Sequence, residues 1–159
     1  MKIKPNYIII PAIVILTSVA GSLFTADSIG TWYTTIVRPD WNPPNWIFGP
    51  VWTTIYTLSA ISALLVWNKA PKKKKKQRNT TMWLFAFNAF MNASWSYIFF
   101  NRQDLYSAVL VAGVLALSVL LIMIYAYKIN KLASWLLLPY VLWVTFATYL
   151  SYTIYTLNM

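Results

Sequence analysis

Five long apolar stretches, separated by short polar or proline-rich segments, dominate the hydrophobic pattern of the chain. They cover residues 7–26, 46–67, 81–100, 105–127 and 133–157. Each has about the 20 residues that an α-helix needs to cross the hydrocarbon core of a bilayer. None shows the alternation of apolar and polar positions that a transmembrane barrel requires, and backbone groups in lipid must bond internally. The pattern therefore predicts an all-α membrane protein, a five-transmembrane-helix bundle.

The composition agrees with a membrane location. The chain has 159 residues, of which 59% are hydrophobic and 10% are charged. Soluble domains have about 45–50% apolar and about 25% charged residues. The length suits one domain, so we expect a single membrane domain over residues 1–159. The first stretch follows the segment Met1-Lys2-Ile3-Lys4 and is too long for a typical signal peptide, so we predict that it is a retained span.

The basic residues are distributed unevenly, and their distribution predicts an orientation. The net charge is +10, and Lys69, Lys72 to Lys76 and Arg78 gather between the second and third stretches. The positive-inside rule favours a cytoplasmic loop over a nucleic-acid site, with attraction to anionic lipid head groups as a consequence. The same placement puts the N-terminus inside and the C-terminus outside, in a multi-pass protein of the cell membrane. The other basic residues then lie inside (Lys2, Lys4, Lys128 and Lys131), except Arg38 and Arg102.

Several kinds of chemistry are excluded by the residues that the chain lacks. It has no Cys and no His, and its only acids are Asp27, Asp40 and Asp104, which all fall outside in this orientation. Thiolate nucleophiles, Cys/His metal sites and the usual axial ligands of haem iron are therefore missing. We expect no metal site and no resident cofactor.

The segment from Arg38 to Tyr56 is the most distinctive part of the sequence. It holds four prolines and three tryptophans and leads directly into the second apolar stretch. Prolines fix the backbone and delay the start of a helix. The pattern indicates a rigid aromatic loop on the outer side, which acts as a lid or as one wall of a binding site.

Three of the predicted helices carry a stripe of large aromatic and small or polar residues at helical spacing. Such a stripe places its members on one face, and an aromatic wall with a few polar groups suits a flat apolar ligand. Helix–helix packing is the competing interpretation. On that interpretation, the Asn92 amide forms a hydrogen bond to a neighbouring helix. Tryptophans near the span ends, Trp41 among them, are typical of an interfacial belt or a loop. The stripes are Trp52, Tyr56, Ser59 and Ala63; Asn88, Asn92, Trp95 and Phe99; and Trp143, Ala147, Leu150 and Ile154.

The loop and these stripes together resemble a known family. The run Trp41-x-Pro43-Pro44-x-Trp46-x-x-Gly49-Pro50-Val51-Trp52-x-x-x-Tyr56 resembles the signature of the TspO/MBR family, the tryptophan-rich sensory proteins that include the mitochondrial translocator protein. Asn92-x-x-Trp95 and Leu138-Pro139-Tyr140-x-x-Trp143-x-x-Phe146-Ala147-Thr148 resemble its third- and fifth-helix motifs. The fourth stretch matches only in general character.

The resemblance implies a five-helix bundle with a cavity beneath the first loop that binds porphyrins and isoquinoline- or benzodiazepine-type ligands. Because the chain has no His or Cys, a metal-free porphyrin such as protoporphyrin is favoured. Animal members carry a cholesterol motif that ends in Lys or Arg; here Leu150-Ser151-Tyr152 has neither after it, so sterol binding is not expected. The candidate ligand-binding residues are Tyr33, Arg38, Trp41, Trp52, Tyr56, Asn92, Trp95, Trp143, Ala147 and Leu150.

Three functions remain open from the sequence. The first is binding or transport of tetrapyrroles, gated by the proline-rich loop. The second is light-dependent oxidative breakdown of the bound porphyrin, for which the oxidisable side chains of Trp52 and Trp143 are the catalytic candidates. The third is ligand sensing without catalysis, with the signal passed through the Lys-rich loop.

A homodimer is the assembly that the resemblance implies. Small residues at helical spacing let two helices approach closely. On the fourth stretch Ala108, Ala112 and Ala116 form either a homodimer seam or a packing face within the monomer, and a stripe at 86, 89 and 93 is a competing seam.

Overall fold

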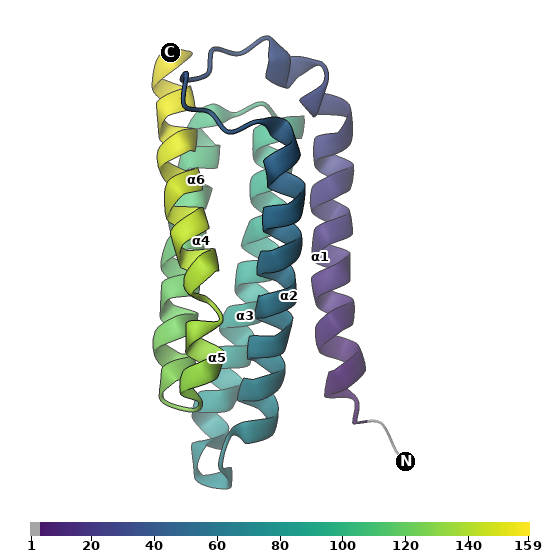
Figure 1. Cartoon of the computed structure of the whole chain (residues 1–159), viewed down its shortest axis with the longest axis vertical. Coiled ribbons are helices and arrows are strands. Elements are labelled where there is room, and N and C mark those ends of the chain that lie inside the picture. The colour runs from purple at the N-terminus through teal and green to yellow at the C-terminus, as the bar shows by residue number, and fades with distance from the viewer. Residues whose placement is uncertain (1–3) are drawn as a thin grey trace.

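Five long helices run alongside one another in the computed structural model, which describes residues 4–159 (Figure 1). A short helix, α5 (Lys131–Trp135), precedes the last of them, and the described residues contain no strand. The prediction of an all-α fold is confirmed. The predicted cytoplasmic location of Lys2 stays a prediction, because Lys2 lies outside the described residues. The long helices are α1 (Asn6–Ile29), α2 (Asn45–Lys69), α3 (Lys75–Ser96), α4 (Leu105–Tyr127) and α6 (Leu138–Leu157).

The connections gather at two opposite ends of the bundle. The start of α1, the Lys-rich turn between α2 and α3, and the turn between α4 and α5 lie at one end (Figure 1). The proline-rich segment between α1 and α2, the link from α3 to α4 and the C-terminus lie at the other end. The basic cluster and the aromatic loop therefore occupy opposite ends of the molecule.

The third helix differs from the predicted stretch 81–100 at both ends. It begins earlier, at Lys75, because Lys, Gln and Arg are good helix formers although they are not apolar. It ends at Ser96 in a wider turn, Tyr97–Asn101, with π-helical bonding. Gln103 then takes a left-handed φ of 54°, which reverses the chain into α4. Asp104 caps α4 by accepting a hydrogen bond from the Ser107 backbone N–H at 3.0 Å. Hydrogen bonds from the Ser107 side chain and then from its backbone N–H lower the pKa of the Asp104 carboxyl.

The fifth predicted stretch, 133–157, is broken in the structure. The short helix α5 ends at Trp135 and α6 begins at Leu138. Pro139 explains the break, because proline has no N–H to donate and its ring clashes with the carbonyl four residues earlier. The backbone of α5 is anchored by the Ser62 hydroxyl, which donates to the Ala133 carbonyl at 2.6 Å.

The small residues of α4 are used inside the monomer. Ala108 is 0% exposed and Ala112 is 3% exposed, and Ala108 packs among Phe99, Phe100 and Leu150. Helix α4 packs against α3 and α6. The interpretation of this stripe as a packing face within the monomer is therefore the one that the structure favours.

The outer surface of the bundle is apolar, as expected for a protein in lipid. Ile8, Leu16 and Leu23 on α1 are each more than 60% exposed. Within the described residues, four segments have the length and apolar composition to cross a membrane: α1, α2, α4 and the stretch Lys131–Leu157. Helix α3 carries more polar side chains, and Asn88 and Asn92 among them are buried against its neighbours. The chain is a multi-pass helical membrane protein.

Candidate ligand-binding cavity

A cavity of about 400 Å³ lies beneath the proline-rich segment, between α1, α2, α3, α4 and α6; we name it the outer cavity. Its volume falls within the range of about 300–1,000 Å³ that is usual for small-molecule sites. Aromatic side chains contribute much of its wall. They are Tyr33, Phe48, Trp52, Tyr56, Trp95, Phe99, Phe100 and Trp143.

The structure brings together most of the residues that the sequence nominated. Arg38 and Trp41 lie elsewhere and do not line the outer cavity. All three sequence stripes reach it, and their lower members Ser59, Ala63 and Asn88 line a second, smaller cavity. The nominated residues that line the outer cavity are Tyr33, Trp52, Tyr56, Asn92, Trp95, Trp143, Ala147 and Leu150.

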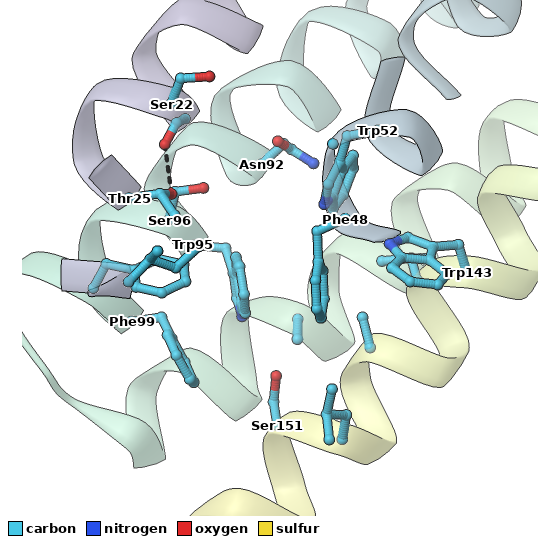
Figure 2. Close-up of a pocket in the computed structure, with 18 of the residues that line it drawn as sticks. Ser22, Thr25, Phe48, Trp52, Asn92, Trp95, Ser96, Phe99, Trp143 and Ser151 are labelled. Atoms are coloured by element: carbon cyan, nitrogen blue, oxygen red, sulfur yellow. Dashed lines mark hydrogen bonds between the residues drawn. The ribbon is translucent and has the colours of Figure 1, made fainter. Parts of the chain in front are cut away.

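The aromatic rings face one another across the cavity from different helices. Figure 2 shows Trp95 from α3, Phe48 from α2 and Trp143 from α6 around the same space. The ring of Trp143 meets Phe48 edge to face, with centroids 5.7 Å apart, and Trp95 stacks on Phe99 at 5.1 Å. Such walls offer ring faces to a flat apolar molecule.

Two hydrogen-bond donors in this wall have no partner. The indole Nε1 atoms of Trp95 and Trp143 are buried and unbonded within the part of the chain that the structure describes. An unpaired buried donor costs about 1–3 kcal/mol, so an acceptor on a ligand would be favoured there. None of the described residues that line the outer cavity is Lys, Arg, Asp or Glu. The lining therefore suits a ligand whose buried part is uncharged and carries hydrogen-bond acceptors.

A chain of hydrogen bonds forms the floor of the outer cavity. The Tyr56 hydroxyl donates to Asn92 Oδ1 at 2.6 Å, and Asn92 Nδ2 donates to the Tyr140 hydroxyl at 3.3 Å. Tyr140 donates to Asn88 Oδ1 at 2.8 Å, and Asn88 Nδ2 donates to Ser118 Oγ at 2.8 Å. Asn92 thus lines the cavity and also bonds two neighbouring helices, so both interpretations of this amide hold. This series of hydrogen bonds fixes the orientation of both buried amides.

The proline-rich segment is fastened to the end of α6. The Val37 N–H donates to Asn158 Oδ1 at 2.9 Å, and Asn158 Nδ2 donates to the Val37 carbonyl at 2.8 Å. Trp41 stacks on Tyr149 with centroids 5.4 Å apart and an interplanar angle of 10°. Trp41 therefore holds the segment against α6 in this structure.

Arg38 lies in a solvent-open crevice beside the outer cavity. The crevice is also lined by Asn42 and Asn45, and Asn45 borders the outer cavity as well. The Arg38 guanidinium lies 4.9 Å from the centroid of the Tyr33 ring. Burial raises the pKa of the Tyr33 hydroxyl, although Arg38 opposes the shift. Tyr33 is therefore neutral at pH 7 and donates to Asn42 Oδ1 at 3.1 Å.

Sequence reasoning missed two parts of the wall. Phe48 lies four residues before Trp52, so the same helical spacing would have included it in the α2 stripe. Helix α1 contributes small residues at similar spacing, which were not among the nominated ligand-binding residues because small side chains stand out little among apolar neighbours. They are Ser18, Gly21, Ser22 and Thr25.

Comparisons with known proteins agree with this geometry. Residues 8–157 match the model of the TspO/MBR family. The chain is 36% identical over 141 residues to the Tryptophan-rich protein TspO of Bacillus cereus, which covers 88% of each chain. It is 34% identical to Protein CrtK of Rhodobacter capsulatus, over 87% of this chain and 86% of that one. It is 31% identical to the human Translocator protein, over 87% of this chain and 81% of that one.

Proposed function

The chain belongs to the TspO/MBR family, and from this premise we propose that it binds protoporphyrin-type tetrapyrroles in the outer cavity. Isoquinoline- and benzodiazepine-type ligands would occupy the same space. The observation that carries the proposal is the wall of Trp52, Trp95 and Trp143, with two unpaired indole donors and no charged lining residue in the described chain. A planar macrocycle with ring-nitrogen acceptors matches that wall.

The charged groups of the ligand would lie toward Arg38. Protoporphyrin carries two carboxylates, which need a positive partner when they leave water. Arg38 is the cation in the crevice that adjoins the outer cavity at Asn45. We therefore expect the macrocycle to lie deep and the carboxylates to face the proline-rich segment.

The Arg38→Gln variant tests the ligand and its orientation together. It is expected to weaken protoporphyrin binding about fivefold, since partly exposed charge pairs contribute up to about 1 kcal/mol. Its affinity for the uncharged dimethyl ester should stay unchanged. The measurement is quenching of tryptophan fluorescence on titration in the dark, with Arg102→Gln, an exposed outer arginine, as the control. Equal loss of affinity for acid and ester would argue against carboxylate recognition by Arg38.

We also propose that all five long helices cross the membrane, with the Lys-rich turn in the cytoplasm. Helix α3 buries its amides in the bundle, so its polar residues need not meet lipid. The chain has no native cysteine, so single-cysteine variants report sidedness without background. Lys73→Cys in spheroplasts is expected to resist an impermeant maleimide until the membrane is opened, whereas Thr35→Cys should react at once. The reverse labelling pattern would overturn the orientation.

Light-driven breakdown of the bound porphyrin is the second candidate function. Trp52 and Trp143 both line the outer cavity, where a photosensitiser would touch two oxidisable indoles. The alternative is a ligand-sensing or carrier protein without catalytic activity. A homodimer is expected from the family, although the alanines of α4 and Ala86 and Ala89 of α3 face the inside of the monomer.

A further inference from the structure

A second cavity of about 80 Å³ lies below the outer one, toward the Lys-rich end of the bundle; we name it the inner cavity. Helices α1, α2 and α3 form most of its wall, and Tyr140 of α6 completes it. Its apolar lining includes Ile13, Val14, Met82 and Phe85. Its polar lining consists of Thr17, Ser59, Asn88, Asn92 and the hydroxyls of Tyr56 and Tyr140.

Ser59 is the residue that sets this cavity apart. Its side chain lines the inner cavity and is 9% exposed, and its hydroxyl has no hydrogen-bond partner within residues 4–159. Two other buried hydroxyls are bonded: Thr17 donates to the Ile13 carbonyl at 2.9 Å, and Ser62 to the Ala133 carbonyl at 2.6 Å. A hydroxyl in a helix usually makes such a bond to the backbone. The buried Ser59 hydroxyl therefore has an unmet capacity for hydrogen bonding beside the inner cavity.

The two cavities share Tyr56 and Asn92. Both residues line both cavities, and the hydrogen bond of 2.6 Å between them lies at the boundary. That bond uses the Tyr56 proton and the Asn92 carbonyl oxygen, while one Asn92 N–H is given to Tyr140. The Tyr56 oxygen can still accept a hydrogen bond, and the second Asn92 N–H can still donate one. A guest near Ser59 would thus meet groups that also face the outer ligand.

Size and charge define the class of guest. A volume of about 80 Å³ is one fifth of the outer cavity and excludes a macrocycle. A water molecule takes about 30 Å³ of liquid and needs two to four polar partners. No lining residue among those described is Lys, Arg, Asp or Glu, so the guest is uncharged. An apolar lining together with an unpaired hydroxyl also accommodates a short hydrocarbon that ends in a hydroxyl.

We propose that the inner cavity is a second binding site, which takes the hydroxyl of a water molecule or a short-chain alcohol on Ser59 and is coupled to the outer cavity through Tyr56 and Asn92. The proposal of a binding site depends on the inner cavity alone and not on the ligand of the outer cavity. The coupling rests on the proposed function, because it concerns the ligand of the outer cavity.

A crystal structure of the full chain, grown with and without 2-bromoethanol, tests occupancy. We expect an oxygen within hydrogen-bond distance of Ser59 Oγ in both crystals. A bromine anomalous peak in the inner cavity assigns the hydroxyl to an alcohol, and oxygen density without bromine assigns it to water. Ser59→Ala should lose the density. A cavity without density in the wild type, at a resolution where other buried waters are visible, would overturn the site whether or not porphyrin binds.

The coupling is tested by protoporphyrin affinity. Ser59→Ala is expected to change the Kd about fivefold, the low end of common coupling between sites. Ser59→Thr keeps the hydroxyl and should restore the wild-type Kd. Thr57→Val removes an exposed hydroxyl from the same helix and is the matched control. An unchanged Kd in Ser59→Ala, or an equal change in Thr57→Val, would overturn the coupling. If the wild type does not bind porphyrin at all, the proposed function fails, and the crystal structure still decides the inner site.

Discussion

Replacing Gly21 with leucine is expected to weaken protoporphyrin binding by about 5–150-fold. Gly21 lies on α1 in the wall of the outer cavity, and a Cβ built there meets Ser96 Oγ at 3.5 Å, an ordinary contact. The backbone therefore tolerates a side chain, and the further carbons of leucine must extend into the cavity. Overfilling a packed space costs about 1–3 kcal/mol. This free energy corresponds to a loss of affinity of about 5–150-fold.

The sequence offers a matched control for this variant. Gly113 lies inside α4, and a Cβ added to it meets nothing within 4 Å. Both substitutions replace a glycine in a helix and gain about 1 kcal/mol of helix propensity, so loss of folding does not explain a difference between them. Dark titration of tryptophan fluorescence gives the Kd of each variant. Equal affinity in Gly21→Leu and Gly113→Leu would place the ligand outside the outer cavity.

The double variant Trp52→Phe/Trp143→Phe is expected to abolish light-dependent loss of bound porphyrin. Excited porphyrin transfers energy to oxygen, the excited oxygen adds to a nearby indole, and the indole peroxide so formed oxidises the porphyrin beside it, with O2 as the oxidant throughout. Both indoles line the outer cavity. Phenylalanine keeps an aromatic face for stacking but is far harder to oxidise than indole. The porphyrin absorbance should then decline only at the rate of free porphyrin in the same detergent and light.

Three comparisons make this second prediction decisive. Trp83→Phe, at a side chain that is 75% exposed near the other end of α3, should bleach porphyrin like the wild type. Darkness or removal of oxygen should stop the loss in every variant. Bleaching at the wild-type rate in the double variant would contradict a role of these indoles. Stable, saturable binding in the wild type under light would leave a receptor or carrier.

The sequence predicted those features that follow from local apolar periodicity. The stretch 105–127 matches α4 (Leu105–Tyr127), and 46–67 lies within α2 (Asn45–Lys69). The stripes on α2, α3 and α6 do line cavities, because residues at i, i+4 and i+7 share a face whatever the helix packs against. The distribution of charge predicted that the Lys-rich turn and the aromatic loop lie at opposite ends of the bundle, and they do (Figure 1).

Features that depend on long-range contacts were beyond the sequence. The proline-rich segment is held by Val37 and Asn158, which are 121 residues apart, so nothing local marks Trp41 as a contact of α6. The break before α6 follows from Pro139, but apolar residues on both sides hid it in the hydropathy pattern. The floor of the outer cavity needs Tyr56, Asn92 and Tyr140 from three helices, and the separate inner cavity follows from that meeting.

The most direct test of the central claim is a structure of the wild-type protein with protoporphyrin bound in the dark. We predict the macrocycle in the outer cavity, in contact with Trp52, Trp95 and Trp143, with its carboxylates toward Arg38. Porphyrin density on the lipid-facing surface of the bundle, with the outer cavity unchanged, would contradict the claim.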